Sequence, residues 1–122
     1  MGAEPGDFES YLAGWRARRD RTAASREEAR VAALALAREL ALLLVERFRV
    51  HRVALVGSLA RGDFDIGSDI DLAVEGLATD ALFRAGAELE KMAGGMAIDL
   101  VPLESASSAY RQHVADEGIV LA

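Results

Sequence analysis

The sequence contains no cysteine, only two prolines and only two histidines among its 122 residues. Without cysteine, neither a disulfide framework nor a thiolate metal site can form. The two histidines, His51 and His113, lie in different elements without ligand-like spacing, and we expect a surface or capping role for each. Any metal site in this chain must therefore be sought among its carboxylates.

Positive charge and long hydrophobic runs are also scarce. The 14 lysines and arginines are outnumbered by 20 acids, which gives a formal charge of −6 and a pI near 4.9. Non-specific nucleic-acid binding relies on basic patches, so this charge argues against a polymerase-like role on long nucleic acid. The most apolar run, residues 40–45, is too short to span a bilayer, and the polar, acidic amino terminus does not resemble a signal peptide. We expect a cytoplasmic protein with no membrane partner.

The length and the 52% hydrophobic content predict one globular domain with a real core. No internal repeat or low-complexity segment is present. A chain of this size has no room for a second domain, and a homo-oligomer is left open.

Two acids stand in a strand-like segment, residues 68–75. Ile70, Leu72 and Val74 alternate there with polar or small residues, which is the two-residue period of a β-strand. Asp69 and Asp71 therefore point to one face and lie roughly 7 Å apart along the strand. Two anions held so close need a cation, and magnesium suits them because it combines protein carboxylates with phosphate and water ligands.

Asp99 is a candidate third ligand. It interrupts the apolar run of residues 96–101, which otherwise reads as a buried strand, and a buried ionised group is costly unless it is paired or metal-bound. The alternative is a solvated face, with Asp99 at the rim of the sheet.

A turn that suits phosphate precedes the acidic strand. Residues 53–56 form a short aliphatic strand that leads directly into Gly57-Ser58 and what reads as one helical turn. Glycine permits a tight turn and close approach to the backbone, and helix N-termini favour anions. Arg61 adds a positive charge one turn later. The alternative is an ordinary tight turn with no ligand.

The turn and the acids can meet only if the two strands are antiparallel. Residues 62–68 are rich in turn-formers and can span the return. We interpret Asp63 and Asp65 as loop carboxylates, not as additional ligands.

The combined pattern is Gly57-Ser58, ten intervening residues, Asp69-x-Asp71 and the later acid Asp99. Over roughly residues 50–122 it resembles the minimal nucleotidyltransferases (MNT) of the DNA-polymerase-beta-like superfamily. The resemblance implies an α/β (α+β) domain in which a central mixed sheet is flanked by helices.

The resemblance also implies transfer of a nucleoside monophosphate, most simply AMP from ATP, to a hydroxyl acceptor. Asp69 and Asp71 would bind magnesium in a two-ion site, and Asp99 would complete that site and help to activate the acceptor. Gly57 and Ser58 would hold the triphosphate, with Arg61 as a further phosphate contact. The charge and position supplied by such a site suit an in-line displacement.

Small proteins of this kind (MntA-like antitoxins) are often encoded beside a HEPN-domain toxin, which they can inactivate by adenylylating a tyrosine. A HEPN toxin is therefore the expected partner. Two alternatives are a binding module that neutralises its partner stoichiometrically and an enzyme that modifies a small-molecule hydroxyl.

Outside the motif, helical patterns predominate. Aromatic and aliphatic residues recur at helical spacing before an arginine cluster and predict an amphipathic helix over residues 1–24; they are Phe8, Tyr11, Leu12 and Trp15, followed by Arg16, Arg18, Arg19 and Arg21. Its apolar stripe either packs against the next helix or forms a surface for a partner protein.

A capping box at Ser25 predicts that a second, mostly buried helix begins there and runs toward Phe48. The nucleotidyltransferase domain is therefore expected over residues 25–122. Thr79-Asp80 can cap a helix that runs through about Met92, and a final helix is expected over residues 105–117 before the apolar residues 119–121.

Overall fold

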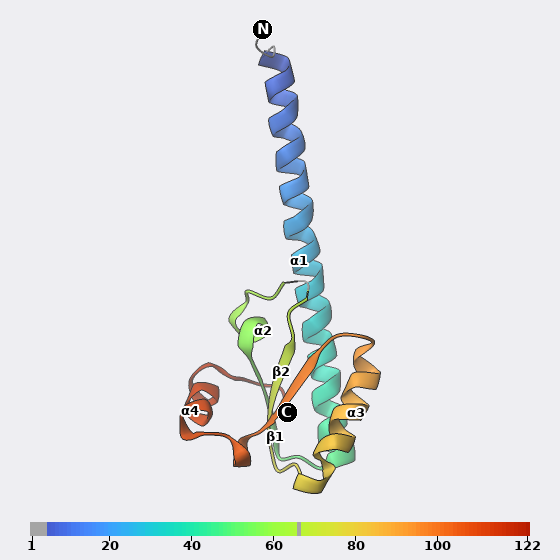
Figure 1. The fold of residues 1–122 in the computed structure, drawn as a ribbon, viewed down its shortest axis with the longest axis vertical. Coiled ribbons are helices and arrows are strands. Elements are labelled where there is room, and N and C mark those ends of the chain that lie inside the picture. Colours follow the sequence, from blue (N-terminus) through green and yellow to red (C-terminus); the bar gives the residue numbers. More distant parts are fainter. Residues whose placement is uncertain (1–4, 66) are drawn as a thin grey trace.

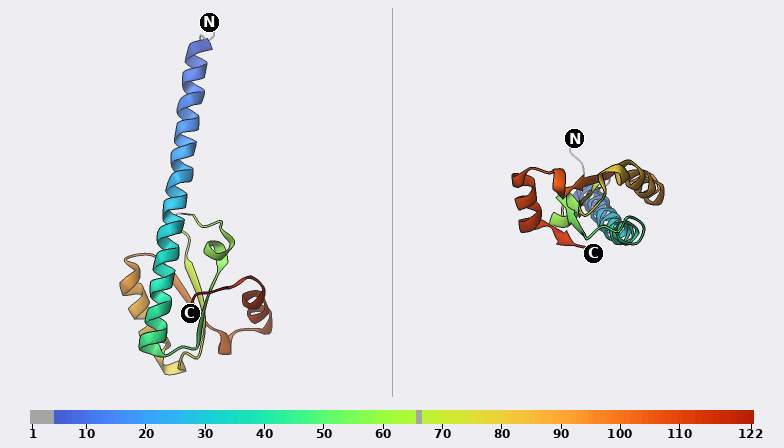
Figure 2. Two further views of the ribbon diagram at one scale, coloured as in Figure 1. Left: turned by 180° about the vertical axis from the view of Figure 1, so that it is seen from behind. Right: turned by 90° about the horizontal axis from the view of Figure 1, so that it is seen from below.

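One long helix and a four-stranded sheet organise the chain (Figure 1). The structure is a computed structural model and describes residues 5–65 and 67–122. Helix α1, Pro5–Phe48, packs its C-terminal half on the sheet, while its N-terminal half projects beyond the rest of the molecule (Figures 1 and 2).

Helix α1 is continuous, so the prediction that a second helix begins at Ser25 is wrong. The capping box was a plausible start signal, but residues 15–48 contain no glycine or proline and are rich in alanine, leucine, arginine and glutamate. These are strong helix formers, and nothing in the segment stops a preceding helix. The helix ends only at Phe48, after which Arg49 adopts a left-handed conformation with φ 55°. The division between residues 1–24 and 25–122 stays a prediction.

The sheet is mixed. Its strands are β1 Arg52–Val56, β2 Ile70–Glu75, β3 Ile98–Pro102 and β4 Ile119–Val120, in the order β3-β2-β1-β4. Strand β1 is antiparallel to both β2 and β4, whereas β2 and β3 are parallel. The expected antiparallel return from β1 to β2 is confirmed, and so is the α/β architecture with helices around a central mixed sheet.

The strand alternation separates two faces of the sheet. Ile70, Leu72 and Val74 are fully buried on the face that α1 covers together with α3, Leu82–Ala93. The opposite face carries a smaller core that includes Ala54, Ala73 and residues of α4, Ser108–Glu117. Figure 2 shows α4 set apart from α1 and α3, as this division requires.

The two shorter helices lie close to where the sequence places them. A single 3-10 turn, Thr79–Ala81, precedes α3, and Gly94 caps that helix in the left-handed conformation. The last helix starts at Ser108, three residues later than predicted, because Leu103–Ser105 forms a separate 3-10 turn. The Ser107 hydroxyl caps α4 by accepting a hydrogen bond of 3.1 Å from the Tyr110 backbone N–H.

Among residues 5–65 and 67–122, no helix lies beside the projecting part of α1 (Figure 1). Phe8, Tyr11 and Trp15 are 60%, 65% and 49% exposed. Of the two interpretations of this apolar stripe, packing against a following helix is wrong, since that helix is the continuation of the same one. None of the described helices, α1 included, combines the length and apolar character needed to cross a bilayer.

The buried half of α1 should carry much of the stability. Leu40 is fully buried between the helix and the sheet, whereas Leu42, two residues along, is 56% exposed. We expect Leu40→Ala to lower the free energy of unfolding by about 3 kcal/mol, because it removes a buried side chain and leaves a cavity. Leu42→Ala should change it by less than about 0.5 kcal/mol. Urea unfolding followed by circular dichroism measures both, and equal losses would contradict the packing described here.

Candidate functional site

The strand register brings the predicted carboxylates to one end of the sheet. Asp71 of β2 is paired with Asp99 of the parallel strand β3, and with Val56 of the antiparallel strand β1. Asp69 immediately precedes β2. Neighbouring strands are about 4.8 Å apart, so Asp71 and Asp99 extend side by side from the same face. This is the face that carries α4.

The charges of these three acids act on one another. Partial burial raises the pKa of Asp71 above its ordinary value of 3.8, and the negative charges of Asp99 and then Asp69 raise it further. The positive charge of Arg61 opposes them but does not reverse the shift. A carboxylate in this position is destabilised when ionised and gains from any cation placed beside it.

Asp99 is exposed, and β3 is not the buried strand that the apolar run predicted. The reason is its place at the edge of the sheet. Ile98 and Leu100 pack against the core under α3, while the other face of the strand, which carries Asp99, stays open. The rim position was the alternative for Asp99, and it keeps the carboxylate available to a ligand.

Gly57 lies directly against Asp71. It has φ +78°, a conformation that side-chain-bearing residues rarely adopt, and a Cβ placed on it would overlap Oδ2 of Asp71. Helix α2, Gly57–Arg61, begins at this point. Glycine is therefore required here for two reasons, and it lets the backbone of the turn approach the carboxylate cluster closely.

Ser58 and Arg61 flank the cluster on α2. Ser58 is half-buried at the start of the helix, and Arg61 ends it. The Arg61 Nε lies 3.6 Å from Oδ2 of Asp63, with both side chains about half exposed or more. The positive charge of Arg61 therefore acts on both Asp63 and Asp71. A polyanion bound between these two acids would contact the guanidinium.

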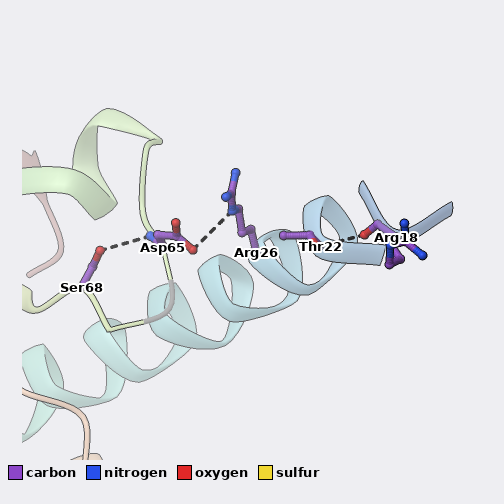
Figure 3. Close-up of polar contacts among 5 residues, drawn as sticks. All are labelled: Arg18, Thr22, Arg26, Asp65 and Ser68. Carbon is purple, nitrogen blue, oxygen red and sulfur yellow. Dashed lines mark hydrogen bonds and ion pairs between the residues drawn. The ribbon is translucent and has the colours of Figure 1, made fainter. Parts of the chain in front are cut away.

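Asp63 and Asp65 are held by arginines. In addition to the Arg61–Asp63 pair, Oδ1 of Asp65 lies 3.3 Å from Nε of Arg26 on α1, and the Asp65 backbone N–H donates to the Ser68 hydroxyl at 3.1 Å (Figure 3). These contacts agree with the interpretation of both acids as loop carboxylates, and they attach the loop before Asp69 to the long helix.

The carboxylates do not form a finished metal site. Within residues 5–65 and 67–122, no group of three acids or histidines is close enough to surround one ion. The donor set nevertheless fits magnesium, which takes hard oxygen ligands and completes its shell with water and substrate phosphate. Burial and the negative charges of Asp99 and Asp69 raise the pKa of Asp71, so a cation beside this carboxylate would be favourable. The roles of Asp69, Asp71 and Asp99 as ligands stay predictions.

Tyr110 is a neighbour of the site that the sequence did not reveal. It lies on α4 and packs against the smaller core, and its pKa is raised by burial and by the negative charges of Asp71 and Asp99. No short motif marks it. Its nearness depends on how α4 folds back over the sheet, and the predicted helix over residues 105–117 carried no signal of which face would meet the acids.

The histidines agree with the roles expected for them. His51 is exposed in the turn before β1. His113 is half-buried on α4, where its Nδ1 lies 3.4 Å from a carboxylate oxygen of Glu117 and its ring lies 6.5 Å from that of Tyr110.

A separate cleft of about 900 Å³ lies at the other end of the same sheet face. Arg52, Glu75 and Arg111 contribute to its walls, and apolar residues of the sheet and α4 form its floor. Glu75 is four residues along β2 from Asp71, a distance of roughly 13 Å. This cleft therefore does not coincide with the carboxylates, and the candidate site lies at the acids because the charges and the motif converge there.

Comparison with known proteins identifies the family to which most of the chain is similar. The family model described as polymerase beta, nucleotidyltransferase, matches residues 38–122. None of the curated proteins compared matches the chain significantly.

Several solved structures are similar. A toxin–antitoxin structure with AMP-PNP is 29% identical, with a TM-score of 0.61, over 70% of this chain and 72% of its own. A minimal nucleotidyltransferase is 32% identical, with a TM-score of 0.60, over 70% of this chain and 90% of its own. A complex of a tri-AMPylated Shewanella oneidensis HEPN toxin with its MNT antitoxin is 26% identical, with a TM-score of 0.57, over 74% and 71%.

The contact between Gly57 and Asp71 can be tested against a matched glycine. Gly62 also has a positive φ, +88°, but no atom lies within 4 Å of a Cβ built on it. We expect Gly57→Ala to abolish the rise in thermal unfolding midpoint that AMP-PNP with magnesium produces, because the new methyl group displaces Asp71. Gly62→Ala, which carries similar backbone strain, should keep that rise. An equal response of the two variants would contradict the close approach.

The raised pKa of Asp71 also has a consequence for stability. A folded-state pKa above the unfolded value means that ionised Asp71 opposes folding once the pH exceeds about 3.8, and that the penalty is complete above the folded-state pKa. In metal-free buffer we therefore expect Asp71→Asn to be more stable than the wild type at pH 7. The variant should lose this advantage as the pH falls through the folded-state pKa of Asp71 towards 3.8 and below. Urea unfolding at several pH values measures the difference. A variant less stable than the wild type at pH 7 would contradict the electrostatic interpretation.

Proposed function

Because the chain belongs to the polymerase beta nucleotidyltransferase family, we propose that it transfers an adenylyl group from ATP to a tyrosine hydroxyl of a HEPN-domain toxin and so acts as an antitoxin. The observation that carries this proposal is the pairing of Asp71 with Asp99 in adjacent strands, with Asp69 and Gly57 beside them. That is a cluster of negative charge directly against the backbone of the turn at which α2 begins.

The proposed transfer is a single displacement at phosphorus. The acceptor oxygen forms a bond to the α-phosphorus of ATP, and the bond from that phosphorus to the oxygen bridging to the β-phosphate breaks. Pyrophosphate leaves with the electron pair of the broken bond, and the hydroxyl proton passes to a base. Asp99 is exposed at the rim beside Asp71 and is our candidate for the residue that accepts the proton.

The other residues bind and position. The backbone at Gly57 and Ser58 would hold the triphosphate, which approaches the acids closely because Gly57 has no side chain. Arg61 would bind a phosphate oxygen with a charge that its partner Asp63 only partly neutralises. Magnesium, when bound by Asp69, Asp71 and Asp99, supplies positive charge that stabilises the attacking and leaving oxygens.

The choice of acceptor follows from the similar proteins. One of them forms a toxin–antitoxin structure with AMP-PNP, and in another the HEPN toxin in complex with the MNT antitoxin is AMPylated. This chain shares their fold, with TM-scores of 0.61 and 0.57, and that likeness supports ATP as donor and a protein hydroxyl as acceptor. The proposal places the reaction in the cytoplasm.

Intact-mass spectrometry of the HEPN toxin that is this chain's partner tests the proposal. After incubation with the chain, magnesium and ATP, the toxin should gain one or more adenylyl masses. Asp71→Asn should lower the rate by a factor of roughly 10³ or more, since it removes a ligand charge and keeps the side-chain volume. Asp63→Asn is the matched control, because that acid pairs with Arg61 in the loop, and it should retain activity within about tenfold.

The same experiment separates the alternatives. A toxin that gains no mass, yet is neutralised equally by the wild type and by Asp71→Asn, would replace the enzyme with a stoichiometric binding module. Adenylylation of a small-molecule hydroxyl, with the toxin unmodified, would retain the family chemistry and overturn the acceptor.

A further inference from the structure

The projecting part of α1, residues 5–25, has no role in the site described above. It lies outside residues 38–122, which the family model matches. The hydrogen bonds and ion pairs that the described side chains of residues 8–25 make stay within the helix, such as the bond of 2.9 Å from the Thr22 hydroxyl to the Arg18 carbonyl (Figure 3). At 1.5 Å per residue the segment is about 31 Å long.

One face of this segment is apolar and uncovered. Phe8, Leu12 and Trp15 follow one another at intervals of four and three residues, which places them on a single side of a helix. Tyr11 borders them. Phe8, Tyr11 and Trp15 are each about half exposed or more, and the guanidinium of Arg19 lies 5.2 Å from the centre of the Trp15 ring. An exposed cluster of large aromatic residues next to arginine is typical of a contact surface.

The stripe continues the face by which α1 is anchored. The same intervals of three and four residues lead from Trp15 through Thr22 and Arg26 to Ala29 and Ala33, which pack on the core. The projecting stripe is therefore directed along the side of the helix that the folded domain occupies further down. Arg26, where the projection meets the domain, pairs with Asp65 of the loop before the acidic strand.

The charges of the segment are divided between its two halves. Residues 5–14 carry two acids, Asp7 and Glu9, and no base. Residues 15–25 carry four arginines and one acid, Asp20. A helix that is acidic at one end and basic at the other complements a second copy of itself that runs in the opposite direction.

We propose that the projecting segments of two copies of this chain pair as an antiparallel helical dimer. The register that brings the acidic half of each copy onto the basic half of the other opposes residue 12 to residue 15 and residue 8 to residue 19. Leu12 then packs on Trp15 of the second copy, and Phe8 lies under the stem and guanidinium of its Arg19. Because the pair has twofold symmetry, every contact occurs twice.

The flanks of the pair are also complementary. Glu9 and Arg16 are seven residues apart and lie on the same flank of the stripe, and in an antiparallel pair this flank meets its own counterpart. Glu9 of each copy therefore faces Arg16 of the other. Within one copy they are two turns apart, too far for a direct ion pair.

The pairing leaves room for both folded domains. In this register Pro5, the first residue of each segment, opposes Thr22 of the other copy, about one helical turn before Arg26, where the domain begins. A second copy thus covers the whole stripe without having to overlap the sheet, and the two domains lie at opposite ends of the paired helices. A partner of another kind would need an unrelated surface with the same division of charge, whereas a second copy has that division by its own sequence.

Trp15 provides a direct measurement, since it is the only tryptophan in the chain. We expect the full-length chain in low-salt buffer to sediment at twice the chain mass at high concentration and at the chain mass on dilution. Trp15 emission should shift to longer wavelength over the same concentration range, because dissociation exposes the indole. The experiment requires neither ATP nor a toxin, so its outcome is independent of the proposed function.

Charge reversal identifies the register. We expect Glu9→Arg and Arg16→Glu each to weaken the dimer about tenfold or more, because each turns two attractive pairs into two repulsive ones. The double variant, Glu9→Arg with Arg16→Glu, should restore the affinity to within about threefold of the wild type. Arg38→Glu, an exposed reversal on the same helix beyond the segment, is the control and should leave the dimer unchanged.

Three results would overturn the proposal. One is a chain that stays monomeric at every concentration. This result would overturn the proposal even if Trp15 emission shifted on addition of a toxin protein. Another is a dimer whose dissociation leaves Trp15 emission unchanged, which would place the contact elsewhere. The third is a double variant as weak as either single variant, which would exclude this antiparallel register.

Discussion

Repulsion among Asp69, Asp71 and Asp99 is the constraint on which the rest of the structure depends. Burial of Asp71 and the neighbouring charges of Asp99 and Asp69 raise the pKa of Asp71, so its ionised form opposes folding. The three carboxylates stay together because the backbone pairing of β2 with both β1 and β3 fixes the positions from which these side chains extend. The hydrogen bonds and apolar packing of the sheet hold the charges in position, and a cation with a polyphosphate would relieve the repulsion.

The two faces of the sheet divide these tasks. Ile70, Leu72 and Val74 point to the face covered by α1 and α3, and this face supplies most of the buried apolar area. Asp71 alternates with them and points to the other face, where α4 covers only part of the surface. A residue shift of one position in β2 would exchange the two sets, so the aliphatic packing that stabilises the domain also fixes where the acids point.

Helix α1 joins an anchored part and a free part. Its C-terminal half is held by buried alanine and leucine side chains, while its N-terminal half exposes an aromatic stripe. The ion pair of Arg26 with Asp65 connects this helix to the loop that precedes Asp69. Both side chains are about half exposed, so the pair contributes little to stability. Its importance is positional, since it attaches the loop to α1 at the point where the projecting part of the helix begins.

Much of the site could be predicted from the sequence because its parts are local. The alternation of residues 68–75 predicted the strand that forms over Ile70–Glu75, with Asp71 opposite the aliphatic side chains, and the glycine at position 57 marked a turn that needs an unusual backbone conformation. The same periodicities located the β-strands and the last two helices to within a few residues. These signals depend on neighbours one to four residues apart, which a single sequence displays.

Tertiary structure alone decided how those parts meet. The pairing of Asp71 with Asp99, the edge position of β3 and the nearness of Tyr110 depend on contacts between residues far apart in the chain. The capping box at Ser25 has the form of a helix start, yet it lies in the middle of α1 because no residue before it ends the helix. Local sequence patterns determined which residues are charged, which form turns and which pack in the core. The order of the strands and the packing of the helices determined which of these residues share one site.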